Sequence, residues 1–189
     1  MDVTETHKSP DRQDWRLWLA ENHHRKSEIW LLYDDRESVD TVSYLESVEE
    51  AICFGWIDGL QKRINENEKA QRFTPRKKNS NWTELNKERA RNLIAEGRMT
   101  EAGLGSLPDL DEEFVIPRYI LEAVNENPQI LANFNELPAL YIRVRISYID
   151  EMRKRPEELN KRLANFLKKT EQGKLFGNWN DGGRLGGSV

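Results

Sequence analysis

The sequence is poor in the residues that build disulfides and metal sites. Its only cysteine is Cys53, which excludes an internal disulfide and a cysteine-rich zinc site. We expect Cys53 to be a small buried side chain rather than a nucleophile, because it falls at the apolar end of a predicted helix with no histidine nearby in sequence. The three histidines, His7, His23 and His24, form no His-x-x-x-His pair. We therefore predict no metal site.

Motifs that bind common cofactors are also missing. The chain has no Gly-x-Gly-x-x-Gly fingerprint, no P-loop and no Gly-x-Ser-x-Gly turn. We expect no cofactor. The carboxylates are numerous, but none falls in a pattern that singles out an acid/base pair. Whether the protein is an enzyme therefore stays open, and Asp58, between Trp56 and Gly59, is the first carboxylate to test.

Long apolar runs are absent as well. No segment approaches the ~18 apolar residues of a membrane-spanning helix, and no apolar stretch follows Met1–Lys8 as it would in a secretory signal. We expect a cytoplasmic protein with no membrane partner.

The 29 Lys and Arg against 33 Asp and Glu give a net charge of −4, which makes the chain a poor general binder of nucleic acid.

The sequence does contain enough apolar surface for a folded core. Apolar residues make up 37% of the 189 residues, with six Trp, six Phe and five Tyr among them. Charged residues make up 33%, which fits one core with a charged exterior. We predict a single domain over residues 1–172 and a flexible glycine-rich tail over 173–189.

Hydrophobic periodicity predicts an α+β fold with a helical C-terminal third. A small antiparallel sheet of three strands is expected to be packed by several helices. The predicted strands are 28–34, 56–64 and 70–76, and the predicted helices before the C-terminal third are 10–22, 43–54 and 82–96.

Three capping signals mark the starts of these helices. Ser9 followed by Pro10 predicts the first start. Ser43 and Glu46 form a capping-box pattern, and Asn81 with Glu84 forms a second one.

The segment 71–91 is basic within an acidic protein. It carries a net charge of +5, whereas residues 104–138 carry −6. Two interpretations stay open. Either both segments are solvated surfaces or face each other across the fold, or the basic segment binds an anion.

The anion interpretation depends on strand geometry. In an extended segment Arg72, Thr74 and Arg76 share one face, and Ser80 follows close to a predicted helix N-terminus, which favours negative charge. Guanidinium groups, a hydroxyl and this helix end together make a plausible anion site. The alternative is that Ser80 caps the helix and Asp58 pairs with an arginine.

Two tryptophans flank this region. Trp56 and Trp82 would suit a planar ligand beside the arginines, and Asn86 lies one helical turn after Trp82 as a possible polar anchor or a second cap-like contact. The alternative for each tryptophan is ordinary core packing.

Four blocks of this sequence resemble the YdeI/OmpD-associated family, often labelled bacteriocin-protection. Their order and spacing agree with the family, and the resemblance covers about residues 12–170. One departure is Glu151–Pro156, where a proline replaces part of a basic stretch. The four blocks are Ala51–Gly59, Arg72–Arg76, Ser80–Asn86 and Gly97–Gly103.

The resemblance implies a part in resistance to bacteriocins or cationic antimicrobial peptides. It brings no established reaction, substrate or cofactor. The positions that a family-wide ligand site would use are Trp56, Asp58, Arg72, Thr74, Arg76, Ser80, Trp82 and Asn86.

Three functions follow from these observations, in order of preference. The first is a cytoplasmic binding or stress-protection protein that recognises a small anionic ligand. The second is an enzyme of unknown reaction, with Asp58 as general base beside Arg72 and Arg76. The third is a nucleic-acid binder that uses residues 71–91 and stacks bases on tryptophan. The sequence leaves the oligomeric state open.

Overall fold

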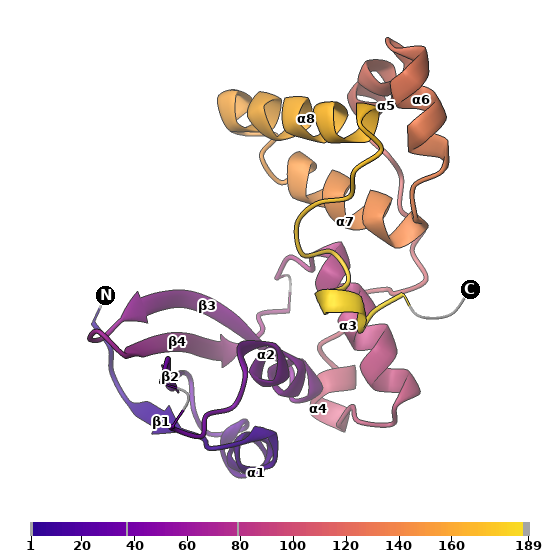
Figure 1. Ribbon diagram of the computed structural model, residues 1–189. Helices are drawn as coiled ribbons and strands as arrows, with labels where there is room; N and C mark the ends of the chain where they lie inside the picture. The colour runs from indigo at the N-terminus through magenta and orange to yellow at the C-terminus, as the bar shows by residue number, and fades with distance from the viewer. Residues whose placement is uncertain (1, 37, 79, 187–189) are drawn as a thin grey trace. The chain divides into compact units, whose positions relative to one another are not determined.

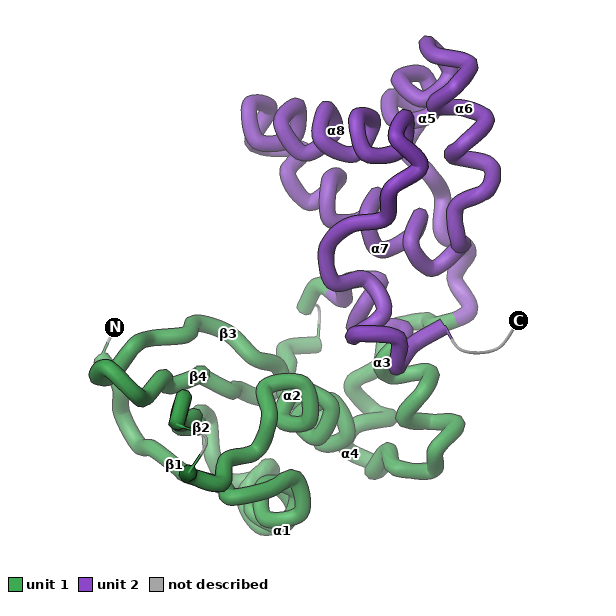
Figure 2. Tube along the Cα trace, viewed as in Figure 1, with its two compact units in different colours: residues 1–81, 89–110 green, residues 82–88, 111–189 purple. Residues whose placement is uncertain are grey.

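The computed structural model describes residues 2–36, 38–78 and 80–186. The chain forms two compact units: unit 1 holds residues 1–81 and 89–110, and unit 2 holds residues 82–88 and 111–189 (Figure 2). Helix α3, Glu84–Ala95, contributes to both units. The prediction of one domain over residues 1–172 stays a prediction. No helix in the described ranges is long and apolar enough to cross a membrane.

Unit 1 is built on a four-stranded sheet in the order β1-β2-β4-β3 (Figure 1). The central pairs, β2 with β4 and β4 with β3, are antiparallel, whereas β1 is parallel to β2. The α+β prediction and its three strands are confirmed, and β1 is an additional strand. The strands are β1 (Thr6–Lys8), β2 (Ile29–Asp34), β3 (Trp56–Arg63) and β4 (Glu68–Pro75).

Helices α1 (Arg12–Asn22) and α2 (Tyr44–Cys53) supply the apolar cover of unit 1. The largest side chains of this core are almost fully buried, and the indole of Trp15 also donates to the carbonyl of Ser47 at 3.0 Å. In the second half of β4 burial alternates with the strand pattern, since Gln71 and Phe73 are buried while Arg72 and Thr74 are partly exposed. The buried aromatic core residues are Trp15, Trp30, Trp56 and Phe73.

Helix starts differ from the prediction at two of three sites. The Ser43–Glu46 capping box is present. The cap of α1 is Asp11, which accepts from the backbone N–H of Asp14 at 2.8 Å, so the prediction of Ser9 was wrong. Ser9 is instead buried, and its carbonyl accepts from the N–H of Val42 at 3.0 Å.

Helix α3 begins at Glu84 rather than near Asn81. The hydroxyl of Thr83 accepts from the N–H of Asn86 at 3.2 Å, so Thr83 takes the capping place predicted for Asn81. The helix ends before Gly97, whose φ of +67° fits the left-handed turn expected of a stop residue.

A buried ionic cluster joins three segments of unit 1. The carboxylate of Glu50 is fully buried and accepts from Arg12 at 2.6 Å, from Arg16 at 2.6 Å and from Arg98. Arg12 also pairs with Glu49 at 2.7 Å. The cluster links α1, α2 and the segment after α3. The three arginines compensate the negative charge of Glu50, which would otherwise be costly to bury.

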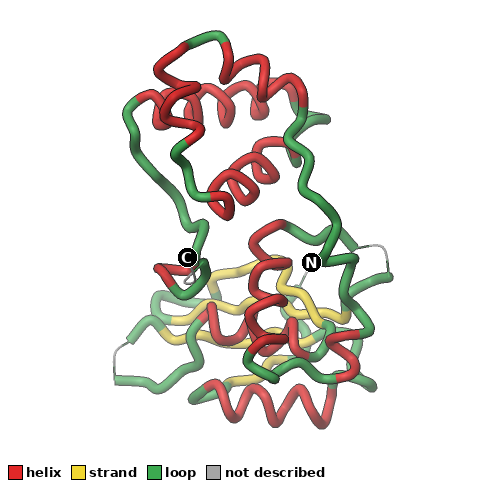
Figure 3. Tube along the Cα trace, turned by 90° about the vertical axis from the view of Figure 1, so that its right-hand side faces the viewer, coloured by secondary structure: helices red, strands yellow, loops and turns green. Residues whose placement is uncertain are grey.

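Within its described residues, unit 2 contains helices and loops (Figure 3). The helical C-terminal third is therefore confirmed. Its core centres on Ile120, Tyr141 and Phe166. The helices are α5 (Arg118–Asn125), α6 (Pro128–Asn135), α7 (Ala139–Asp150), α8 (Pro156–Glu171) and the short η1 (Asp181–Gly183).

The glycine-rich end of the chain carries side chains that pack in unit 2. Phe176 and Trp179 lie edge-on to the ring of Tyr141, with ring centroids 6.3 and 5.5 Å apart. Leu185 is buried beside Leu140. Side chains from residues 173–186 therefore pack against the helices of unit 2.

Candidate functional site

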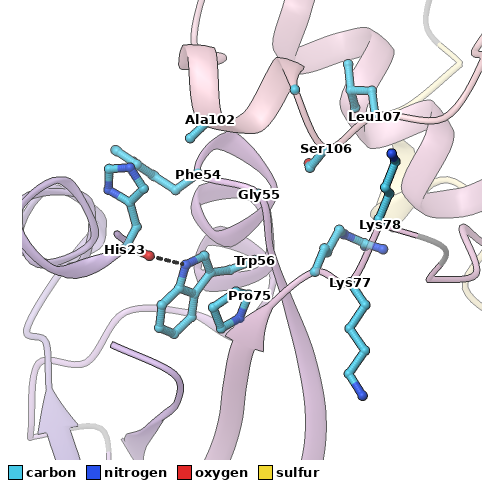
Figure 4. Close-up of a pocket in the computed structure, with 12 residues that line it drawn as sticks. His23, Phe54, Gly55, Trp56, Pro75, Lys77, Lys78, Ala102, Ser106 and Leu107 are labelled. Atoms are coloured by element: carbon cyan, nitrogen blue, oxygen red, sulfur yellow. Dashed lines mark hydrogen bonds between the residues drawn. The ribbon is translucent and has the colours of Figure 1, made fainter. Parts of the chain in front are cut away.

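A cleft of about 570 Å³ opens in unit 1 where β3 and β4 meet the segment after α3 (Figure 4). Three consecutive cations line it, Arg76, Lys77 and Lys78, and no carboxylate is among its lining residues. The other lining residues are His23, Phe54, Gly55, Trp56, Pro75, Ala102, Gly105, Ser106 and Leu107.

Gly55 fixes the back of the cleft. Its φ is +72°, and a Cβ at this position would lie 2.8 Å from the carbonyl oxygen of Ala102. Only glycine fits such a close approach without strain. The carbonyl of Gly55 accepts from the N–H of Arg76 at 2.8 Å, which holds the first cation next to the start of β3.

A second glycine brings the opposite wall into place. A Cβ on Gly103 would lie 2.2 Å from the carbonyl oxygen of Cys53. The same carbonyl accepts from Thr100 through its N–H at 3.1 Å and its hydroxyl at 2.6 Å. Helix α4, Glu101–Leu104, is thereby fixed against the end of α2, and this places Ala102 and Ser106 at the cleft.

Arg76 carries the most desolvated charge of the cleft. Burial lowers the pKa of Arg76 to about 10, and the nearby Asp58 opposes this lowering. The guanidinium is still a cation at neutral pH, and Nη1 donates to the carbonyl of Asn81 at 3.4 Å. A partly desolvated arginine binds anions more strongly than one in open solvent.

Trp56 lines the cleft from within the core. Its side chain is 1% exposed, its Nε1 donates to the carbonyl of His23 at 3.3 Å, and its ring lies edge-on to Trp18 at 6.1 Å. With this burial the indole offers no free face for stacking. Its contribution to the cleft is a rigid wall.

Arg72 and Thr74 share a partly exposed face of β4, whereas Gln71 and Phe73 are buried, as the alternation predicts. Arg72, however, donates to the carboxylate of Glu28, from Nε at 2.9 Å and also from Nη2. Neither Arg72 nor Thr74 lines the cleft.

Asp58 is also outside the lining. Its carboxylate accepts from the hydroxyl of Tyr44 at 2.7 Å. Of the two arginines that could pair with Asp58, Arg72 pairs with Glu28 instead, whereas Arg76 lies close enough to Asp58 for an electrostatic interaction. Asp58 acts on the cleft through its electrostatic effect on Arg76.

The last three predicted residues are not among those that line the cleft. The N–H of Ser80 donates to the carbonyl of Lys77 at 2.9 Å. Trp82 and Asn86 belong to unit 2, where Trp82 is 8% exposed and the N–H of Asn86 donates to Thr83. Of the eight predicted residues, the structure brings Trp56 and Arg76 together at the cleft.

Comparison with known families fits this division of the chain. Residues 7–106 match the domain of unknown function DUF8412, which is more than half of the chain. The chain belongs to this family. Residues 113–173 match the family described as Bacteriocin-protection, YdeI or OmpD-Associated. No curated protein and no solved structure matches significantly.

The second match confirms the resemblance drawn from the sequence and suggests a function related to bacteriocin protection. All four blocks on which the resemblance was drawn, within residues 51–103, lie in the DUF8412 match, whereas the second match covers residues 113–173. The cleft also lies there, apart from Leu107 at its edge. The cleft is thus a feature of the DUF8412 segment.

Sequence reasoning missed part of the cleft. His23 lies at the end of α1, with Nδ1 2.9 Å from the carbonyl of Leu19, and no local pattern marks it. Lys77 and Lys78 belong to the basic segment but were not included in the predicted site. The block Gly97–Gly103 was a usable signal, because its glycine at position 103 requires close contact with α2. Among the residues described, no cluster of three or more His, Cys, Asp or Glu could hold a metal ion.

Proposed function

We propose that this protein binds a small anion in the unit 1 cleft and works in the cytoplasm in a process related to bacteriocin protection. The observation that carries the proposal is the charge of the cleft. Arg76, Lys77 and Lys78 line it without any lining carboxylate, so the local potential attracts anions although the whole chain is acidic.

Arg76 is the central anion contact in this proposal. Its guanidinium presents several N–H donors in a fixed plane, and its partial burial strengthens each charge-assisted hydrogen bond. Lys77 and Lys78 are exposed and contribute longer-range attraction that salt will screen. The side chains of these two lysines leave the backbone in different directions (Figure 4).

The two alternative functions have less support. An enzyme with Asp58 as general base requires that carboxylate at the ligand, but Asp58 does not line the cleft and accepts from Tyr44. A nucleic-acid binder would need exposed aromatic rings, but Trp56 and Trp82 are 1% and 8% exposed. Within the basic segment, Arg72 pairs with Glu28.

Thermal unfolding with and without inorganic phosphate tests the proposal. Phosphate should raise the midpoint of the wild type, because a ligand that binds the folded state stabilises it. Arg76→Gln should lose this shift. Arg72→Gln is the matched control, since Arg72 lies on the same strand face but outside the cleft lining, and it should keep the shift. No shift in the wild type, or an equal shift in Arg76→Gln, would contradict the proposal.

A further inference from the structure

The cleft is much larger than a simple inorganic anion. Its volume of about 570 Å³ corresponds to roughly twenty water molecules at about 30 Å³ each. It lies within the range of about 300–1,000 Å³ that is typical of sites for organic ligands. An ion with five heavy atoms would leave most of this space to solvent.

The cations and most of the apolar side chains of the lining come from different segments. The three cations come from one consecutive segment, 76–78, directly after β4. Carbon-rich side chains come from other segments: Phe54 follows α2, and Ala102 and Leu107 belong to α4 and the turn after it. In Figure 4, Phe54 and Ala102 lie on the side away from Lys77 and Lys78, whereas Leu107 lies on the side of Lys78.

Two apolar residues of the lining are accessible to a ligand. Ala102 is exposed and Leu107 is partly exposed, so an apolar group placed against them would bury carbon surface that water now covers. The main chain between them is held in place, because Gly103 is fixed against Cys53 and the hydroxyl of Ser106 donates to the carbonyl of Gly103 at 2.8 Å. A ligand would therefore meet a preformed surface.

We propose that the ligand is an organic anion with a compact apolar body. Its phosphate or carboxylate group binds at Arg76 among the cations, and its body lies against Ala102 and Leu107. This inference rests on the proposed function and adds the class of ligand. It excludes a bare inorganic ion as the natural occupant.

Isothermal titration calorimetry on the full chain with three probes tests this class. The probes are inorganic phosphate, phenyl phosphate and phenylacetate, so that the two organic probes distinguish a phosphate head from a carboxylate head. We expect at least one organic probe to bind about tenfold or more tighter than inorganic phosphate, because it buries apolar surface in addition to its charge.

Two variants locate the apolar contact. Leu107→Ser should remove most of the difference in affinity between the organic probe and inorganic phosphate. The affinity for inorganic phosphate should stay unchanged. Leu104→Ser is the matched control, because Leu104 is 48% exposed on the same segment but does not line the cleft, and it should change neither affinity. Circular dichroism checks that both variants fold.

The outcomes separate this inference from the proposed function. If inorganic phosphate binds and both organic probes bind no tighter, the organic class is wrong while anion binding stands. If Leu107→Ser and Leu104→Ser have equal effects, the apolar contact assigned to Leu107 is wrong. If none of the three probes binds the wild type, both the organic class and the anion site are overturned.

Discussion

The guanidinium of Arg72 binds the carboxylate of Glu28, with Nε 2.9 Å from Oε2. The two residues are 44 positions apart in sequence, and they meet because β2 pairs with β4. The strand pattern predicts the same role for Arg72 and Arg76, but this pairing gives them different roles. Arg72 neutralises a carboxylate, whereas Arg76, just beyond the end of β4, lines the cleft.

The buried cluster around Glu50 predicts a large stability effect. Glu50→Gln should lower the free energy of unfolding by about 3–5 kcal/mol, because Arg12, Arg16 and Arg98 would lose their shared carboxylate. Urea unfolding measures the change. Glu21→Gln, an exposed position on α1, should have little effect, and equal effects of the two variants would contradict the structural role of the cluster.

Gly103→Ala should disturb both stability and the cleft. The new Cβ would meet the carbonyl oxygen of Cys53 at 2.2 Å, so α4 has to shift, at a cost of about 1–3 kcal/mol. Gly59→Ala is a milder change outside the cleft lining, since its Cβ would lie 3.7 Å from the nearest atom. Thermal unfolding with and without phosphate should show a lower midpoint and a reduced phosphate shift for Gly103→Ala alone.

Asp34 makes the fold sensitive to acid. Hydrogen bonds from Arg36, with a further one from Lys8, hold the pKa of Asp34 well below its usual range. The carboxylate therefore stabilises the folded state fully above the unfolded-state pKa of about 3.9. This contribution is lost progressively as the pH falls from that value through the lowered pKa of the folded state.

Asp34→Asn should accordingly destabilise the protein at pH 7 and by a smaller amount at pH 3, where part of the contribution is already lost. Urea unfolding at both values is the measurement, with Asp40→Asn, an exposed aspartate, as control. A loss of stability that is the same at both pH values would show that the charge of Asp34 is not responsible.

Cys53 should be unreactive in the folded protein. Burial raises the pKa of its thiol to about 11, and the thiolate is the reactive form. Alkylation by iodoacetamide at pH 8 should be slow in buffer and fast in denaturant. Rapid modification of the folded chain, followed by mass spectrometry, would mean that α2 opens readily at its end.

Local patterns predicted most of the fold of unit 1. The apolar run Ile29–Tyr33 and the alternation in β4 predicted the strands, and the helix at Tyr44–Cys53 begins at its predicted cap. Strand β1 was missed because its three residues, Thr6–Lys8, carry no apolar pattern. Its pairing with β2 comes from tertiary contact rather than propensity.

The cleft was harder to predict because its parts come from distant segments. Arg76 and Trp56 could be singled out from charge and from the family resemblance. The other wall, around Ala102 and Ser106, depends on how Gly103 meets Cys53. Trp82 and Asn86 follow closely in sequence, but they belong to the other compact unit, which no local pattern reveals.

A titration of the isotope-labelled wild type with inorganic phosphate, followed by heteronuclear NMR, tests anion binding in the cleft most directly. The account predicts saturable shifts of the backbone amides of Gly55, Lys78 and Ser106, which line the cleft. The amides of α7, which lies in unit 2, should stay unchanged. Shifts that never saturate, or shifts centred on α7 with the cleft amides unmoved, would contradict it.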